Sequence, residues 1–190
     1  MAIIGKSVLE LPPCENNPRN SEGAFITLKD GTIMFIYSRF AGDKFNDDAS
    51  ASLAVRYSFD KGETWTDEEV IITKDEQKAI NIMSASLMRM NNGDIGLYYV
   101  VRKEANDART HLRRSSDEGK TWSRPVLCIP PKGYYVVNND RIVKLSDGRI
   151  IIPSAYHRNG YTSDKANPYV RFDSRGEAIF FISDEDGKTW

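Results

Sequence analysis

Arginine and aspartate residues with the potential for ligand chemistry lie in irregular, polar stretches of the sequence. Arg19 and Arg141 each stand in a run of polar residues, and Asp47 and Asp48 are adjacent within the segment 41–49. A guanidinium group binds a carboxylate through two parallel hydrogen bonds that lysine cannot imitate. A positioned carboxyl group can act as a general acid or base. A charged loop is also typical of a plain solvated surface, so this chemistry requires a fold that brings the segments together.

Composition excludes several other classes of function. The chain has 26 Lys and Arg against 27 Asp and Glu, which gives a net charge of −1. Such a chain has no positive electrostatic potential to bind a phosphate backbone, so no nucleic-acid partner is expected. No apolar run reaches the roughly 18 to 20 residues of a membrane span, and no cleavable leader is visible. These features predict a cytoplasmic protein, or a secreted or periplasmic one if the N-terminus has been trimmed.

The sequence contains no motif that is typical of a metal or cofactor site. There is no HExxH motif, no phosphate-binding glycine loop and no Ser, His and Asp order that marks a nucleophile. Cys14 and Cys128 lie far apart without metal-ligand spacing and are predicted to be free thiols. We therefore expect neither a metal nor a cofactor.

One eight-residue motif occurs three times and has the composition of a turn. Residues 58–65 read S-x-D-x-G-x-T-W, residues 115–122 repeat the motif in full, and residues 183–190 differ by Glu185 in place of the Asp. An Asp side chain accepts backbone N–H groups within its own turn, and Gly adopts backbone angles that other residues resist. We predict that the aspartates of the motif stabilise turns and take no part in catalysis. The three tryptophans are predicted to pack between neighbouring sheets.

A second repeated signal precedes each copy of the motif. Residues 29–31, 91–93 and 146–148 end in Asp-Gly or Asn-Gly between apolar runs, which is the pattern of a β-hairpin. The predicted strands are 23–28, 32–40, 50–59 and 68–73 in the first unit, 81–90, 94–102, 109–116 and 125–129 in the second, and 138–145, 149–157 and 176–183 in the third. Four-stranded antiparallel units in series are typical of a β-propeller. The sequence thus predicts an all-β fold with three blades, at about 14–73, 81–129 and 136–190, the last without its outer strand.

Strand order divides the connections between two ends of such a fold. In an antiparallel unit the first-to-second and third-to-fourth connections lie at one end, so the hairpins and the repeated motifs should share it. The other end should carry longer, irregular loops, where functional residues concentrate. These are the loops 40–49, 103–108 and 158–175 and the segments 14–22, 74–81 and 130–138 that lead into each unit.

The repeated motif resembles the Asp boxes, or BNR repeats, of sialidases and related glycoside hydrolases. Residues 17–23 and 137–141 also resemble sequence segments of bacterial sialidase-like proteins. Together with the three motif copies, these segments extend the resemblance over essentially the whole chain. It implies a six-bladed propeller, of which residues 1–190 are the N-terminal half. Asp boxes also occur in propellers that bind without cleaving, so the motif is more specific for architecture than for activity.

The resemblance also implies roles for residues of the irregular loops. Sialidases hold the sugar carboxylate with three arginines, use an Asp as general acid and base, and attack through a Tyr paired with a Glu. Because the loop 41–49 follows the second strand, from which that family delivers its acid, Asp47 or Asp48 is the implied catalytic acid. The implied substrate-binding residues are Arg19, Glu22, Arg39, Asn139, Asp140, Arg141 and His157. The alternative role for Glu22 is an ion pair with Arg19 or Arg39.

By this resemblance the protein is an exo-α-sialidase type of glycoside hydrolase that removes a terminal acidic sugar from a glycoconjugate. The alternatives are a carbohydrate-binding propeller without catalysis and a purely structural one. Three blades alone would leave two apolar sheet faces open to water. We therefore expect the remaining propeller half, or a second copy of the chain, to complete the ring, and the isolated segment to be inactive.

Overall fold

The computed structural model describes residues 5–160 and 171–190, and within these ranges every regular element is a β-strand. The first sheet contains β1 (Asn20–Thr27), β2 (Ile33–Ala41), β3 (Ser50–Ser58) and β4 (Glu69–Ile72), paired antiparallel in that order. The second contains β5 (Asn81–Arg89), β6 (Ile95–Glu104), β7 (Asp107–Ser115) and β8 (Val126–Leu127), also antiparallel and in order. The all-β prediction is confirmed.

The third sheet has a broken first strand. Its strands are β9 (Tyr134–Val136), β10 (Val143–Lys144), β11 (Ile150–His157) and β14 (Glu177–Ser183), with a short hairpin of β12 (Asn159–Gly160) and β13 (Arg171–Phe172) beyond β11. Both β9 and β10 pair with β11 on the side away from β14. A single parallel pair, Ala108 with Tyr134, joins the second sheet to the third.

Two sequence predictions are wrong in detail. The continuous strand predicted at 138–145 is interrupted at 137–142, because those residues bond to the neighbouring sheets instead of to β11. The loop predicted at 103–108 is a tight turn at 105–106, because Glu104 and Asp107 still pair across the hairpin. Residues 161–170 of the predicted loop 158–175 lie outside the described residues.

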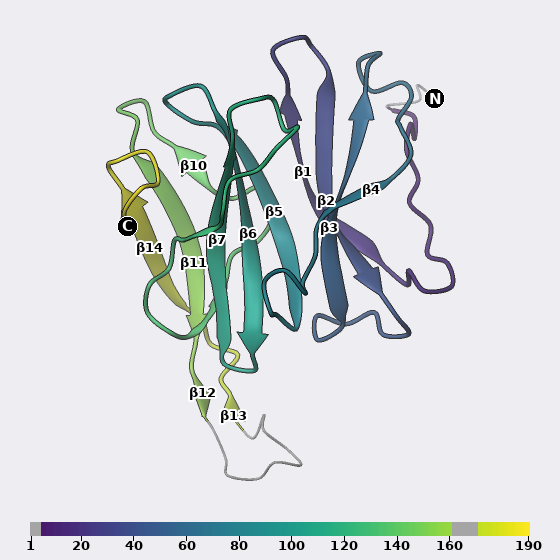
Figure 1. Cartoon of the computed structure of the whole chain (residues 1–190). Helices are drawn as coiled ribbons and strands as arrows, with labels where there is room; N and C mark the ends of the chain where they lie inside the picture. Colours follow the sequence, from purple (N-terminus) through teal and green to yellow (C-terminus); the bar gives the residue numbers. More distant parts are fainter. Residues whose placement is uncertain (1–4, 161–170) are drawn as a thin grey trace.

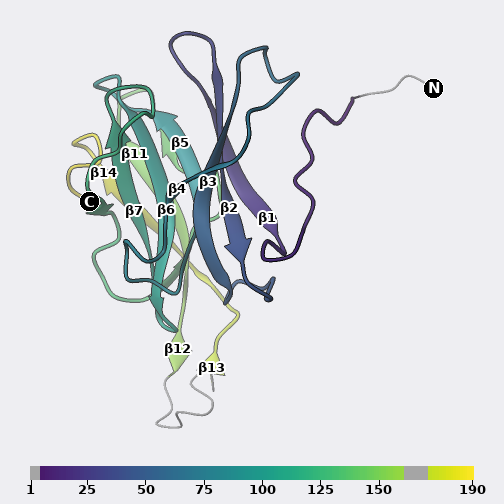
Figure 2. The same cartoon turned by 45° about the vertical axis from the view of Figure 1, so that its right-hand side comes forward.

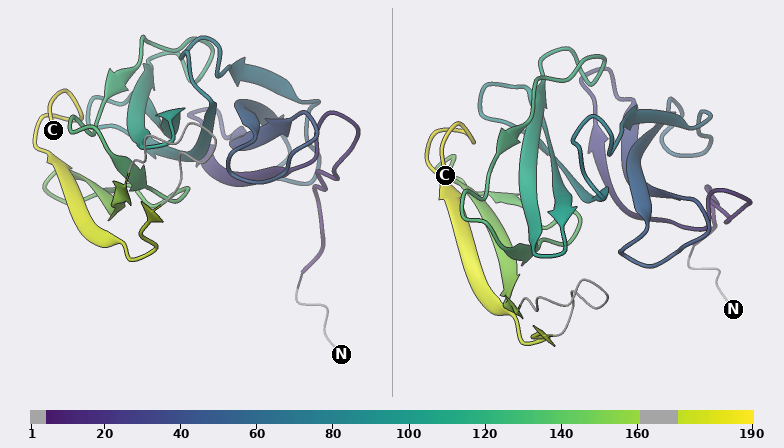
Figure 3. Two further views of the ribbon diagram at one scale, coloured as in Figure 1. Left: turned by 90° about the horizontal axis from the view of Figure 1, so that it is seen from below. Right: turned by 60° about the horizontal axis from the view of Figure 1, so that its bottom comes forward.

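The three sheets stand side by side in chain order and curl around a common axis (Figures 1 and 2). The view from the lower end shows the first sheet on one flank and β11 with β14 on the other (Figure 3). The core between the first and second sheets is formed by apolar side chains that include Met34, Ile36, Leu53, Ile82, Leu97 and Tyr99. The core between the second and third includes Tyr98, Leu112, Ile129, Tyr135, Ile150 and Ile152. Full burial of each Leu or Ile side chain contributes about 1.5–3 kcal/mol, so these two layers hold the sheets together.

The division into two ends is confirmed. At the upper end in Figure 1, the first hairpin meets the second repeated motif through Lys29 N and Glu118 Oε2, and the second hairpin meets the third motif through Asn91 N and Asp186 Oδ1. The β2–β3 loop, the β6–β7 turn and the β12–β13 hairpin lie at the lower end. None of the described residues belongs to a helix that could cross a membrane.

Candidate functional site

The first strand of each sheet is distorted where the three sheets converge. The pairing register shifts between Ser21 and Ala24 in β1 and between Met83 and Ser86 in β5, and the third sheet is broken at 137–142. Each distortion contains a non-glycine residue with positive φ: Glu22 at 58°, Ser84 at 59° and Asp140 at 53°. Such angles are costly for L-residues and persist only where the surroundings impose them, often at functional sites.

Hydrogen bonds join the three distortions to one another. Ser84 donates to Glu22 Oε2 from its backbone N (3.2 Å) and from Oγ (3.3 Å). Asn139 Nδ2 donates to the carbonyl of Gly23 at 2.9 Å, and Asp140 N donates to the carbonyl of Ala85 at 3.1 Å. The bonds cross from sheet to sheet, so the distortions form one connected structure around the axis.

Arg19 lies at the centre of a charged cluster at the lower end. Its Nη1 donates to Asp47 Oδ1 at 2.7 Å, its Nη2 to Glu22 Oε1 at 3.1 Å and its Nε to Ser21 Oγ at 2.9 Å. The guanidinium carbon lies 4.3 Å from the centre of the Phe40 ring, a cation–π distance. The structure therefore brings three of the predicted site residues together: Arg19, Glu22 and Asp47.

Glu22 is held by four donors. Oε1 accepts from Arg19, and Oε2 accepts from Ser38 Oγ at 3.2 Å as well as from both groups of Ser84. A carboxylate with this many partners has little freedom to reorganise around a ligand. Glu22 thus orients Arg19 and links the first two sheets, which agrees with the ion-pair reading of the sequence.

The adjacent aspartates of the β2–β3 loop point to different partners. The Asp47 carboxylate contacts Arg19 of the first sheet, while Asp48 Oδ1 accepts from Nη1 of Arg102 in the second sheet. Sequence reasoning missed Arg102, which lies two residues before the end of β6 with no motif around it. Its role arises only from the packing of the second sheet against this loop.

A cavity of about 80 Å³ opens beside the cluster. Its walls come from all three sheets and are formed by Glu22, Asp47, Asn81, Met83, Ser84, Val100, Arg102, Ala108 and residues 134–138. A few polar groups converge on its apolar walls, but its volume is well below the roughly 300–1,000 Å³ of pockets that enclose a whole small-molecule ligand. The lower end therefore contains a hollow with a cation and two carboxylates at its rim.

Arg39 is placed on the opposite face of the first sheet. Its neighbours Ser38 and Phe40 face the cluster, and alternation along β2 directs Arg39 away from it. There its Nε donates to Glu68 Oε1 at 2.5 Å. Burial alone would raise the pKa of Glu68, but hydrogen bonds from Tyr37 and Arg39 outweigh it, and the net pKa is lowered. The structure does not bring Arg39 to the other candidates.

The remaining candidates belong to the third sheet. The side chains of Asp140 and Arg141 are exposed, and Arg141 has no hydrogen bond or ion pair to any described residue. His157 Nδ1 lies 3.0 Å from the carbonyl oxygen of Asp173, and its ring contacts Tyr134 edge-on at 6.3 Å between centroids. These side chains lie on the sheet that forms one wall of the cavity, but none of them lines it.

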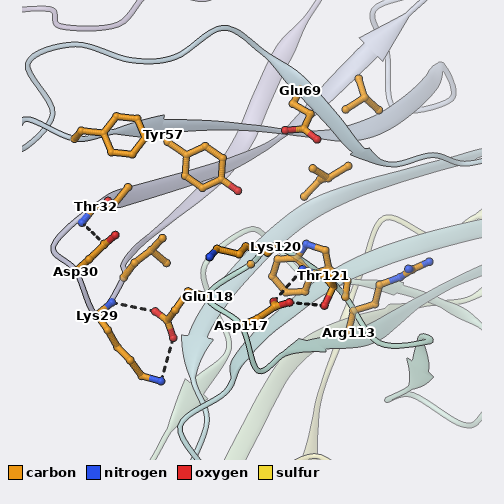
Figure 4. A pocket seen from close by; sticks show the side chains of 16 residues that line it. Lys29, Asp30, Thr32, Tyr57, Glu69, Arg113, Asp117, Glu118, Lys120 and Thr121 are labelled. Carbon is orange, nitrogen blue, oxygen red and sulfur yellow. Dashed lines mark hydrogen bonds and ion pairs between the residues drawn. The ribbon is translucent and has the colours of Figure 1, made fainter.

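The opposite end holds the repeated motifs and a wider groove of about 1000 Å³ between the first and second sheets (Figure 4). There Asp117 Oδ1 accepts from the Thr121 backbone N at 2.9 Å, and Oδ2 accepts from Thr121 Oγ1 at 2.6 Å. These two bonds and one from Ser115 hold the pKa of Asp117 at about 2. Asp60 repeats the pattern in the first motif, with its pKa also held at about 2 by Thr64. The predicted turn geometry is confirmed.

Glu118, which lines this groove, connects the first sheet to the second. Glu118 accepts from Lys29 N at 3.0 Å and from both terminal nitrogens of Arg89, at 2.6 and 2.9 Å. In the third motif, Glu185 takes the place of Asp and accepts from Thr189 Oγ1 at 2.6 Å. The groove is therefore a zone of structural contacts between sheets.

Among the described residues, no group of three or more His, Cys, Asp or Glu is arranged to hold a metal ion. Cys14 is exposed, Cys128 is buried, and both are free, as predicted.

Comparison with known proteins supports the repeat assignment. Residues 36–190 match the profile of the BNR repeat-like domain. No curated protein sequence matches the chain significantly. A Hadza microbial sialidase is structurally similar with a TM-score of 0.69 at 16% identity, over 92% of this chain and 37% of its own. The leech intramolecular trans-sialidase, solved with 2,7-anhydro-Neu5Ac, gives a TM-score of 0.68 at 11% identity, over 100% of this chain and 45% of its own.

A glycosidase with another substrate has the same fold. The Penicillium chrysogenum α-L-arabinanase, complexed with arabinobiose, gives a TM-score of 0.58 at 15% identity, over 85% of this chain and 46% of its own. At these identities the likeness shows the fold alone, which is β-propeller-like. The chain spans less than half of the length of each of these three structures.

Proposed function

The chain belongs to the BNR repeat-like domain family, and from that premise we propose that its protein is a sialidase-type glycoside hydrolase. Its three sheets would be three blades of a six-bladed propeller, and its substrate a glycoconjugate with a terminal acidic sugar. The observation that carries this proposal is the ion pair of Arg19 with Asp47, which lines the cavity together with Glu22, at the end opposite the Asp boxes.

Arg19 has the chemistry to hold the carboxylate of such a sugar. It is permanently charged, planar and fixed in orientation by Glu22 and Ser21. The arginine is partly exposed, at 28% of its side chain, so a ligand can reach it. A carboxylate bound there competes with Asp47 for the guanidinium. Asp47 is then released beside the bound sugar.

An aspartate of the β2–β3 loop would act as the general acid. It donates a proton to the glycosidic oxygen as the bond from that oxygen to the anomeric carbon breaks, and the aglycone leaves as an alcohol. The resulting carboxylate then takes a proton from the water that completes hydrolysis. We assign no nucleophile to the described residues of this chain.

The test is turnover by the full-length protein. A fluorogenic sialoside and a fluorogenic arabinoside are offered in parallel, because the arabinanase shares the fold. Glycan-array binding is measured on the same preparation. Hydrolysis of the sialoside supports the proposal. Hydrolysis of the arabinoside alone, or glycan binding without any turnover, overturns it, and the second result favours the carbohydrate-binding alternative.

A further inference from the structure

We infer that Asn81 and Arg102, both on the second sheet, position the β2–β3 loop so that Asp48 is its anchor and Asp47 its catalytic acid. The catalytic half of this statement rests on the proposed function. The positioning half stands on contacts between the loop and the neighbouring sheet.

Asn81 fixes the main chain of the loop on both sides of Asp48. Its side chain is completely buried, and its Nδ2 donates to the carbonyl oxygens of Asp47 at 2.6 Å and of Ala49 at 3.1 Å. A buried amide cannot exchange these acceptors for water without cost. The backbone around the two aspartates is therefore tied to the start of β5.

Arg102 holds the same loop through a charge. Its side chain is only 6% exposed, and its Nη1 donates to the carbonyl of Asp47 at 3.2 Å and to the carboxylate of Asp48. The guanidinium carbon lies 5.4 Å from the centre of the Tyr134 ring on the third sheet. Because a buried guanidinium stays charged, it requires an anionic partner close by. Asp48 supplies that partner and is committed to it.

Asp47 combines a fixed main chain with an accessible side chain. Its main chain is held by two donors from the second sheet, while its side chain is 62% exposed and lies 2.7 Å from Arg19. A general acid must be fixed in place and yet within reach of the substrate. Asp48 is 54% exposed as well, but its partner Arg102 is buried, whereas Arg19 is 28% exposed and can exchange Asp47 for a ligand. Asp47 therefore meets both conditions.

The experiment compares five variants of the full-length protein: Asp47→Asn, Asp48→Asn, Arg102→Ala, Arg102→Lys and the control Arg109→Ala. Arg109 makes a largely buried ion pair with Asp107 on the same sheet, at 2.6 Å, without touching the loop. Two readouts are taken. One is hydrogen exchange of the amides of residues 43–49, and the other is kcat and KM for glycosides with poor and activated leaving groups.

Arg102→Ala is expected to speed exchange in the loop at least about tenfold. It should also lower kcat for the poor leaving group by about 10- to 100-fold, and for the activated one much less, because a misplaced acid loses catalytic power. Arg102→Lys, which keeps the charge, should restore part of both effects, and Asp48→Asn should resemble Arg102→Ala. Asp47→Asn should show the full leaving-group effect, about 10² to 10⁴, with unchanged exchange. The control should match the wild type in exchange and in the ratio of the two substrates.

The positioning role of Arg102 and the assignment of Asp47 as the acid can be overturned independently of each other. Unchanged loop exchange in both Arg102→Lys and Asp48→Asn overturns the positioning role, even if Arg102→Ala does not fold. A leaving-group effect in Asp48→Asn with none in Asp47→Asn overturns the assignment of the acid. If the wild type hydrolyses no glycoside, the proposed function is wrong, and the acid assignment with it. Exchange then decides the positioning role by itself.

Discussion

Arg19 is the residue on which the proposed ligand site depends most. Replacing it with Lys keeps the charge but removes the planar pair of donors that matches a carboxylate. We expect Arg19→Lys to raise KM for an acidic glycoside by about 10- to 100-fold, which corresponds to the loss of one strong, charge-assisted interaction. The measurement is steady-state kinetics on the full-length protein.

Arg39→Lys is the matched comparison, because Arg39 lies on the same strand but on the other face, beside Glu68. Its KM should stay within about twofold of the wild type. A larger rise for Arg39→Lys than for Arg19→Lys would show that the sugar carboxylate binds elsewhere.

Ser115 shows at the residue scale why the repeated motif is structural. Its buried Oγ accepts from Gly119 N and donates to Asp117 Oδ1, both at 2.7 Å. Ser115→Ala leaves a buried N–H without its partner, so we expect a loss of about 1–3 kcal/mol in the free energy of unfolding. Urea denaturation measures it, with the exposed hairpin serine in Ser146→Ala as control. Equal midpoints for the two variants would refute the structural role.

The elements are joined by a contact that recurs from motif to motif. The residue after the motif's acidic position has positive φ in each copy: Lys61 at 63°, Glu118 at 60° and Asp186 at 56°. In the second and third copies its carboxylate accepts the backbone N–H of a residue in the preceding sheet's hairpin, Lys29 or Asn91. The left-handed angle directs the side chain across the boundary between sheets. The motif is therefore both a turn and a connection between sheets.

Glu118 makes this contact sensitive to pH. The Arg89 guanidinium, together with Lys29, lowers the pKa of Glu118 to about 2 from an ordinary 4.5. A lowered pKa in the folded state means that the stabilisation is complete above the unfolded-state pKa and is lost as pH falls toward 2. Glu118→Gln should therefore lower the melting temperature at pH 7 and make little difference near pH 2. Thermal unfolding across this range tests the prediction.

The control for Glu118 is the exposed pair of Lys132 with Glu104, where Glu104→Gln should change stability by less than about 0.5 kcal/mol. An equal effect of Glu118→Gln at pH 7 and at pH 2 would contradict an electrostatic origin.

At the scale of the whole molecule, the outer face of the first sheet is apolar and open. It carries Phe25, 55% exposed, stacked on Phe35 at 4.2 Å between ring centroids, with Trp65 against both. The outer face of the third sheet exposes Phe180 at 62% and Ile182 at 43%. Apolar faces of this kind are normally buried in soluble proteins. We expect further sheets, from the same chain or from a second copy, to cover both.

A polypeptide of residues 1–190 should therefore self-associate at micromolar concentration. The double variant Phe25→Ser with Phe180→Ser should reduce that association, because it breaks the apolar surface of both faces. Sedimentation velocity measures the effect. A compact 21.5 kDa monomer with wild-type side chains would contradict the expectation, since it would show that three sheets remain soluble with both faces open.

The sequence by itself predicted the all-β class and the propeller-like fold. The repeated Ser, Asp, Gly and Thr positions carry their own turn chemistry, and the Asp-Gly and Asn-Gly hairpins fix strand order, because both depend on bonds between residues close in the chain. The antiparallel order of the predicted strands then placed the loops at the two ends of the fold. Arg19 and Asp47 could be proposed because they stand in the loops of one end.

Only the tertiary structure decided how those loops are held and which residues meet. The bonds from Ser84 to Glu22 and from Arg102 to Asp48 join residues that lie 54 or more positions apart in the chain. The third sheet is broken at 137–142 because its residues bond to different sheets. No local pattern encodes such bonds, because they depend on how adjacent sheets pack. The same packing separated Arg39 from Arg19, since a side chain one position along a strand faces the opposite side of the sheet.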